Sequence, residues 1–261
     1  MLKARVYDKI ILKLTKEVKH LNGNKLKLVA ATTMFLDHMG LLLFPHIAFF
    51  RIIGRLSMPL YAFLISEGAI HTSNKLKYFL EIFLMGALCQ SVYIIEELLT
   101  FGIRSVYLNI LITFSFSLLI IFPYLKAKKL YEKKLDRKAV PYFLLFILAL
   151  SFAVFFEVFS RNSLKLTGIS VKTDYGLMGM LLPFSACLFK DKFKRLLSFS
   201  VCLIIFNFYI MVSMPYTWFS LLVIPILLIY NGKRGEKGFK YAFYLFYPLH
   251  LGFLYILAML I

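Results

Sequence analysis

The sequence predicts an all-α integral membrane protein with about nine transmembrane helices. Three observations support this prediction: the composition, the spacing of the long apolar runs, and the placement of the basic residues. Of the 261 residues, 61% are hydrophobic and 17% are aromatic, and the mean hydropathy is +0.79. An average soluble domain is about 45–50% apolar. The composition therefore favours a chain that is surrounded by lipid.

Apolar runs recur along the chain and are separated by short polar stretches. A helix needs about 20 apolar residues to cross the ~30 Å hydrocarbon core of a bilayer. The sixth and eighth runs are short enough to be tilted, broken or re-entrant. The predicted spans are approximately 28–47, 49–70, 77–97, 106–125, 140–159, 174–189, 195–213, 217–230 and 239–260.

A basic segment precedes the first span. Apolar Val6, Ile10 and Leu14 recur at helical spacing, with lysines between them. This pattern is typical of an amphipathic helix on an anionic leaflet, and it equally suits a solvated cytoplasmic lead-in. Because no loop is long enough to fold alone, we divide the chain into a cytoplasmic segment, 1–27, and one polytopic transmembrane domain, 28–261.

The basic residues alternate from loop to loop. With nine spans and the N-terminus inside, 25 of the 31 lysines and arginines lie on the cytoplasmic side, four lie outside, and Arg51 and Arg55 lie within the membrane. Cytoplasmic loops of membrane proteins carry such an excess of positive charge. We therefore predict a cytoplasmic N-terminus and an external C-terminus. This topology accounts for the net charge of +18. We therefore expect the lipid bilayer to be a partner and expect no binding of nucleic acid.

The three cysteines, Cys89, Cys187 and Cys202, lie inside apolar runs and far apart in sequence. No CxxC or zinc-type spacing occurs, which argues against a metal site. We expect these cysteines to pack between helices, and we expect no metal.

Ionisable residues concentrate in the first two spans. Each such group costs about 2.5 kcal/mol or more at the centre of a bilayer, so it has to pair, line a wet cavity or take part in chemistry. Asp37 and His38 lie in the first span. A neutral imidazole is the usual general base, so His38 is the candidate catalytic residue and Asp37 would orient it or balance charge. The alternative is a structural histidine that is hydrogen-bonded between helices.

Arg51 and Arg55 are four residues apart and share one face of the second span. Because arginine stays charged, the pair needs an anion: Asp37, a phosphate or carboxylate ligand, or a developing oxyanion. We expect the two arginines to bind an anionic ligand or to stabilise developing negative charge. A purely structural pairing with Asp37 is the alternative.

Two further groups are candidate substrate-binding or supporting residues. Glu67 and His71 lie at the inner end of the second span, either as an exposed pair or lining a cytoplasmic opening. Asp174 and Tyr175 open the sixth span, where Asp174 is also suited to cap the helix.

The last span carries one polar stripe. Tyr244, Tyr247 and His250 follow one another at intervals of three residues. An interfacial aromatic belt does not explain a histidine in mid-membrane, so a functional role and an interhelical hydrogen bond are both open for His250.

Together these residues resemble the TraX family of integral membrane proteins, which is related to membrane-bound acyltransferases with a catalytic histidine. The middle of the chain, about 95–170, matches only in being apolar with a basic loop. The resemblance rests on DHMG at 37–40, FRIIGRLSMP at 50–59, LISEG at 64–68, DYGLMG at 174–179 and YLFYPLH at 244–250.

The resemblance implies acetyl transfer. The best-known family role is acetylation of a conjugative pilin at the bacterial cytoplasmic (inner) membrane, with acetyl-CoA as donor. By this resemblance His38 would promote transfer to an acceptor on the outer face, and Arg51 and Arg55 would hold the donor or the oxyanion. The acceptor would be an amine or hydroxyl of a peptide, a pilin-like protein or a glycan.

Two other functions compete with the acetyltransferase. A transporter or channel could use Asp37, Arg51, Arg55 and Glu67 as a proton or anion path, and a membrane scaffold could use the same groups to join helices. The polar residues concentrate in the first two spans and the last, whereas a transport path more often recruits both halves of a chain. The clustering favours a single reaction site.

Overall fold

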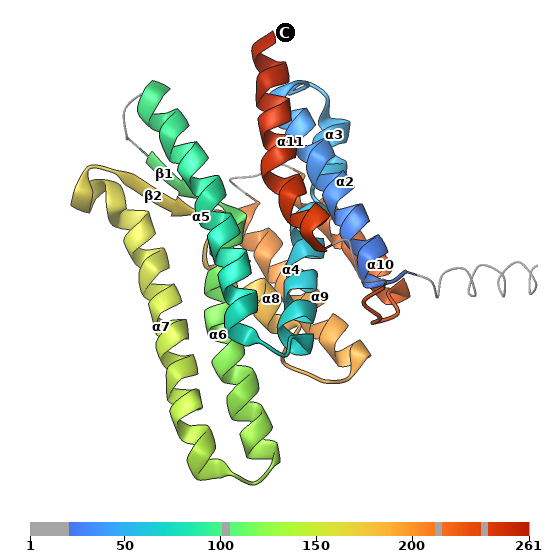
Figure 1. Cartoon of the computed structure of the whole chain (residues 1–261), viewed down its shortest axis with the longest axis vertical. Helices are drawn as coiled ribbons and strands as arrows, with labels where there is room; N and C mark the ends of the chain where they lie inside the picture. Colours follow the sequence, from blue (N-terminus) through green and yellow to red (C-terminus); the bar gives the residue numbers. More distant parts are fainter. Residues whose placement is uncertain (1–20, 101–104, 212–215, 236–239, 261) are drawn as a thin grey trace, which may run out of the picture. The chain divides into compact units, whose positions relative to one another are not determined.

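The computed structural model describes residues 21–100, 105–211, 216–235 and 240–260 (Figure 1). A few side chains near the end of α5 and the start of α11 also lie outside this description. Most of the predicted basic segment, residues 1–20, lies outside the described residues. Its last residues, 23–27, already belong to α2 (Gly23–Leu42) and do not precede it. The Asn22 side chain caps this helix by accepting a hydrogen bond from Lys25 N at 3.0 Å.

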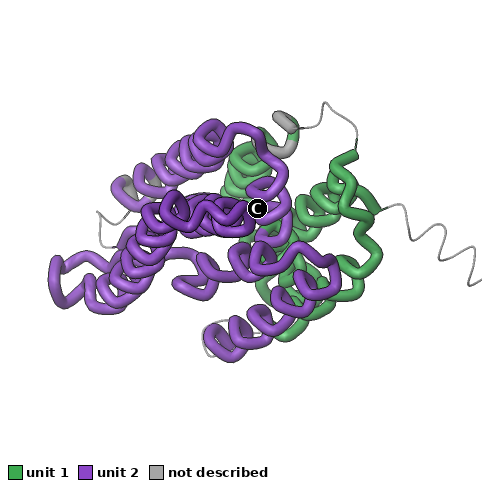
Figure 2. Tube along the Cα trace, turned by 90° about the horizontal axis from the view of Figure 1, so that it is seen from below, with its two compact units in different colours: residues 1–61, 214–261 green, residues 62–213 purple. Residues whose placement is uncertain are grey.

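The chain folds into two compact units, which Figure 2 distinguishes by colour. Unit 1 comprises residues 1–61 and 214–261, and unit 2 comprises residues 62–213. The single transmembrane domain predicted for residues 28–261 stays a prediction.

Unit 1 combines an early and a late segment of the sequence. Its helix α2 packs against α3 and against α11, which follows about 200 residues later in the sequence (Figure 1). Leu26, Ala30 and Met34 are among the buried residues of α2. The elements are α2 (Gly23–Leu42), α3 (Ala48–Gly54), the start of α4 (Ser57–His71), η1 (Thr217–Leu222), α10 (Val223–Ile229) and α11 (Lys240–Leu260).

Unit 2 is built around the antiparallel pair α6 and α7. Lys134, in the left-handed conformation with φ 57°, forms the turn between them. Ile120, Ala153 and Met180 join α6, α7 and α8 in one buried cluster. The elements after α4 are α5 (Lys75–Thr100), β1 (Ser105–Leu108), α6 (Ile110–Glu132), α7 (Asp136–Thr167), β2 (Ser170–Thr173), α8 (Gly176–Ser185) and α9 (Lys192–Ile210).

A two-stranded parallel sheet corrects two of the predicted boundaries. The span predicted for 106–125 begins instead in β1, and the loop predicted for 160–173 is the end of α7 followed by β2. In the sheet, Ser105 pairs with Ser170 and Leu108 with Thr173. The β1 segment, SVYL, is short and mostly apolar, so hydropathy alone does not separate it from the helix that follows, and the polar β2 segment, SVKT, is too short to stand out from a loop.

Helix side chains close both outer edges of this sheet. On the β1 side, the Gln90 amide donates to Tyr107 O at 3.0 Å and accepts from Asn109 N at 2.9 Å. On the β2 side, Ser160 Oγ donates to Val171 O at 2.7 Å, and Val171 N donates to Ser163 Oγ at 2.8 Å. An open sheet edge beside a lipid phase would leave backbone groups unsatisfied. Side chains from α5 and α7 satisfy backbone groups of this kind at both edges of the strand pair.

Five helical segments are long and apolar enough to cross a bilayer, among the residues that the structure describes. The chain is a multi-pass membrane protein of the all-α class. Three of the other predicted spans are short apolar helices, and α2 covers the first at 23–42 rather than 28–47. The full count of nine stays a prediction. The five segments are Ala48–His71, Lys75–Ile95, Ile110–Glu132, Asp136–Thr167 and Lys192–Ile210.

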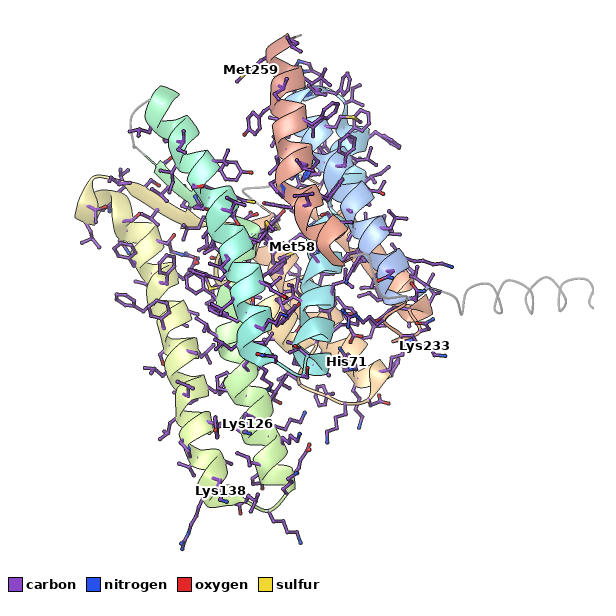
Figure 3. The ribbon with its side chains drawn as sticks, in the orientation of Figure 1. Met58, His71, Lys126, Lys138, Lys233 and Met259 are labelled. Carbon is purple, nitrogen blue, oxygen red and sulfur yellow. The ribbon has the colours of Figure 1, made fainter. Side chains whose placement is uncertain are left out.

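The basic loop of unit 2 lies at the end of the α6–α7 pair that is opposite β1 and β2. Figure 3 shows Lys126 and Lys138 towards this end. The loop is shorter than the predicted 126–139, because α6 continues to Glu132 and α7 starts at Asp136. Most of the basic residues predicted for this loop therefore lie on the ends of α6 and α7. The orientation, N-terminus inside and C-terminus outside, stays a prediction.

Candidate functional site

His38 of α2 contacts His250 of α11. The two side chains come from opposite ends of the sequence and meet with His38 Nδ1 2.7 Å from His250 Nε2. Their ring centres are 5.0 Å apart and the ring planes differ by 21°. A centre separation this large for so short a nitrogen–nitrogen distance means that the two nitrogens face each other along the line of centres. The contact is therefore an in-line hydrogen bond rather than a face-to-face stack.

His250 is enclosed on α11. Its side chain is only 4% exposed. The Phe246 ring stacks on it at 4.7 Å between centres, and Tyr247 meets it edge-on at 5.8 Å. His250 Nδ1 lies 2.7 Å from the carbonyl oxygen of Phe246, one turn earlier. The predicted polar stripe is confirmed for Tyr247 and His250, whereas the side chain of Tyr244 lies outside the described residues.

Asp37 faces a different partner from His38, as expected for adjacent residues of a helix. Arg51 Nη1 lies 2.9 Å from the Asp37 carboxylate and donates to the Asp37 carbonyl oxygen at 3.1 Å. Arg55 Nη2 approaches the same carboxylate at 4.0 Å. Asp37 therefore balances the arginine charges and does not bind the His38 ring.

The close packing of α2 on α3 brings these groups together. A Cβ atom placed on Gly54 would overlap the side chain of Asp37, and one placed on Gly40 would come within 2.6 Å of Phe50 Cβ. Glycine at both positions lets the helices approach closely enough for the ion pair to form.

The cluster carries an excess of positive charge. Asp37 is the one acidic residue in the described part of unit 1. Arg51 and Arg55 share it, and Arg55 is buried to 6% exposure. Two guanidinium groups beside one carboxylate leave a net charge of +1. A membrane-embedded cluster with this charge is suited to an anionic group or a developing oxyanion.

Glu67 has a partner in unit 2 that the sequence did not indicate. Arg195 Nη2 of α9 donates to Glu67 Oε1 at 2.6 Å. The Glu67 side chain is 8% exposed, whereas that of His71 is 66% exposed and its Nε2 lies 3.8 Å from Glu67 Oε2. The interpretation as an exposed helix-end pair is therefore wrong for Glu67, because a second helix covers it. No spacing pattern connects residues 128 positions apart.

Asp174 does not occupy the cap position of α8, which corrects that expectation. The cap residue is Tyr175, in the left-handed conformation with φ 60° and with no capping hydrogen bond from its side chain. Glu157 of α7 instead accepts from Leu177 N at 3.0 Å. Asp174 accepts a 2.9 Å hydrogen bond from the Tyr107 hydroxyl of β1. A carboxylate from another helix has replaced a local cap.

The Tyr107–Asp174 pair lies beside the sheet, outside the membrane-spanning helices. Partial desolvation and the nearby Asp174 carboxylate raise the pKa of Tyr107 well above its ordinary value. Tyr107 therefore keeps its proton and donates it to the carboxylate. The pair ties β1 to the start of α8. Tyr175 packs against Phe206 of α9, with 5.6 Å between ring centres.

No group of three or more His, Cys, Asp or Glu side chains is arranged to hold a metal ion within the described ranges.

The model of the TraX protein family matches residues 22–258, which is most of the sequence. The chain belongs to the TraX family. The matched range contains His38, His250, Asp37 and both arginines.

This TraX family member is also similar to one curated protein. It is the probable fimbrial assembly protein FimC of Dichelobacter nodosus, which is 28% identical over 254 residues, covering 88% of this chain and 93% of the relative. No solved structure matches the chain significantly.

Proposed function

We propose that this protein is an integral membrane acetyltransferase that moves an acetyl group from cytoplasmic acetyl-CoA to an amine or hydroxyl at the outer face of the bacterial cytoplasmic membrane. The observation that carries the proposal is the arrangement within unit 1. A part-exposed imidazole, His38, is anchored at Nδ1 by His250 at 2.7 Å. The preceding residue of the same helix, Asp37, contacts two arginines.

The proposed reaction needs one base and one anion site. The acceptor nitrogen or oxygen attacks the thioester carbonyl carbon, and its proton passes to His38 Nε2. The new bond to the acetyl carbon forms as the carbon–sulfur bond breaks, and the proton moves from His38 to the leaving thiolate. The products are the acetylated acceptor and CoA, so protons and electrons balance. Positioned general bases contribute typically about 10²–10⁴-fold in rate.

Arg51 and Arg55 would form the anion site. Their excess positive charge would stabilise either the developing oxyanion of the tetrahedral intermediate or the phosphates of the donor. Loss of one oxyanion donor typically costs about 10²–10³-fold in turnover. Asp37 would keep the two guanidinium groups close together, since without it like charges would repel. In this scheme Glu67, His71, Asp174 and Tyr175 support the fold or the substrates and do not perform the proton transfer.

A fimbrial or pilin-like protein is the acceptor class that we favour. Support comes from the similar protein, which is named as a probable fimbrial assembly protein, and from the family match. A free amino group at the end of such a protein would supply the nucleophile. A peptide or a glycan hydroxyl would react by the same scheme.

The test is acetyl-CoA binding and release of CoA by the purified protein in detergent, with a free-amine peptide as acceptor. We expect turnover in the wild type and a loss of about 10²–10⁴-fold in His38→Ala with binding retained. His46→Ala is the matched control, because His46 is exposed in the turn between α2 and α3. If the wild type neither binds nor turns over acetyl-CoA, the proposal is wrong. A proton or anion flux assay in vesicles would then test the transporter.

A further inference from the structure

We infer that His250 is a positioning residue that fixes the hydrogen of His38 on Nδ1 and so leaves the lone pair of Nε2 for the substrate. Its catalytic consequence rests on the proposed function, but the hydrogen position itself does not. The inference comes from the contacts of both ring nitrogens of His250.

The backbone sets the first hydrogen. His250 Nδ1 is 2.7 Å from the carbonyl oxygen of Phe246. A carbonyl oxygen only accepts, so Nδ1 has to carry the hydrogen. In a neutral imidazole one nitrogen is a donor and the other an acceptor. Nε2 of His250 is therefore the acceptor.

His250 then sets the hydrogen of His38. Because His250 Nε2 accepts, the facing nitrogen, His38 Nδ1, has to donate across the 2.7 Å contact. The in-line geometry of the two rings favours a strong hydrogen bond. In the neutral His38 ring the lone pair is then on Nε2. In a neutral histidine, the hydrogen bond made by one ring nitrogen determines whether the other nitrogen carries the hydrogen or the lone pair.

The surroundings of His250 hold it in this position. The Phe246 ring stacks on it with planes only 8° apart, and Phe35 of α2 lies 6.4 Å from its ring centre. With its ring 4% exposed, His250 has little freedom to turn. His38 keeps part of its surface exposed. A buried ring thus supports a more accessible one.

This arrangement assigns separate roles to two residues. In serine proteases a buried carboxylate holds the catalytic histidine in the correct tautomer. Here a carbonyl oxygen, acting through His250, does this work, because the Asp37 carboxylate faces Arg51. Asp37 is left to balance charge.

Nitrogen NMR of the histidine rings tests the hydrogen position without any assay of activity. We would label the full-length protein in detergent with ¹⁵N-histidine and assign signals with His38→Ala and His250→Ala. Both His38 and His250 should carry the hydrogen on Nδ1 in the wild type. A hydrogen on Nε2 of neutral His38 would overturn the inference. The chain has five histidines, so the spectrum is simple: His20, His38, His46, His71 and His250.

Substitutions at His250 separate positioning from packing. His250→Gln places an amide oxygen near the position of Nε2 and should keep the hydrogen of His38 on Nδ1. His250→Asn reaches only the region of Nδ1, so its His38 should shift towards the Nε2–H form. We expect turnover to fall by about 10- to 100-fold in His250→Asn with the KM for acetyl-CoA unchanged, and to be restored substantially in His250→Gln.

The outcomes distinguish the two proposals. Acetyl transfer with the hydrogen of His38 on Nε2, or equal turnover in His250→Gln and His250→Asn, would refute the positioning role alone. An absence of acetyl transfer in the wild type would refute the proposed function, while the spectrum would still decide the tautomer. If His250→Asn fails to fold, the wild-type and His250→Gln spectra decide it.

Discussion

At the residue scale, two ion pairs of unit 2 have similar nitrogen–oxygen distances but differ widely in burial. Glu67 and Arg195 are 2.6 Å apart with side chains 8% and 15% exposed. Glu132 and Lys190 are 2.5 Å apart but 38% and 75% exposed. Water and salt screen the second pair, whereas removing one partner of the first leaves an uncompensated charge among helices.

We therefore expect Glu67→Ala to lower the stability of the protein by about 3–5 kcal/mol. Glu132→Ala, the matched control, should leave the stability almost unchanged, because water and salt screen this exposed pair. The measurement is the thermal unfolding midpoint of the two purified variants in the same detergent. Equal shifts in the two variants would contradict the argument from burial.

At the element scale, the approach of α2 to α3 depends on a missing side chain. Gly54 lies against Asp37, where an added Cβ would overlap the carboxylate side chain. Gly252 of α11 is also in a helix of unit 1, but an added Cβ there would meet nothing within 4 Å. The two positions differ in packing and not in secondary structure.

Gly54→Ala should separate α2 from α3 and disturb the contact between Asp37 and Arg51. Overpacking of this kind costs about 1–3 kcal/mol. Gly252→Ala should be neutral or stabilising by about 0.5–1 kcal/mol, since alanine favours a helix. Thermal unfolding in detergent measures both effects. A Gly54→Ala protein as stable as Gly252→Ala would show that the helices do not pack as described.

Elements also differ in how far the sequence predicts them. Long apolar helices such as α7 follow from hydropathy, because every lipid-facing position has to be apolar. The strands β1 and β2 do not follow from it. Gln90 and Ser163, from the helices that precede the two strands, form hydrogen bonds with backbone groups at the edges of the strand pair. Local patterning carries no information about such partners.

At the scale of the whole molecule, the basic residues predict the orientation of each loop. The turn between α6 and α7 carries Lys133, and the opposite end of α7 carries Lys165; both are exposed. With 25 of the 31 basic residues assigned to the cytoplasmic side, these two positions should lie on opposite sides of the membrane.

Cysteine labelling tests this orientation. In intact cells a membrane-impermeant maleimide should label Lys165→Cys, and it should label Lys133→Cys only after the membrane is permeabilised. The unsubstituted protein is the control for its own cysteines, of which Cys89 and Cys187 are buried. Labelling of Lys133→Cys in intact cells would reverse the predicted topology.

The sequence by itself determined the membrane class, the family and the residues of the candidate site. It did so because apolar length, loop charge and costly intramembrane groups are all properties of local composition. Only the tertiary structure decided which of these residues act together. In the structure His38 contacts His250, Asp37 forms an ion pair with Arg51, and Glu67 forms an ion pair with Arg195. Those contacts depend on how distant helices pack, and packing is decided by side-chain shape at each interface rather than by any periodicity along the chain.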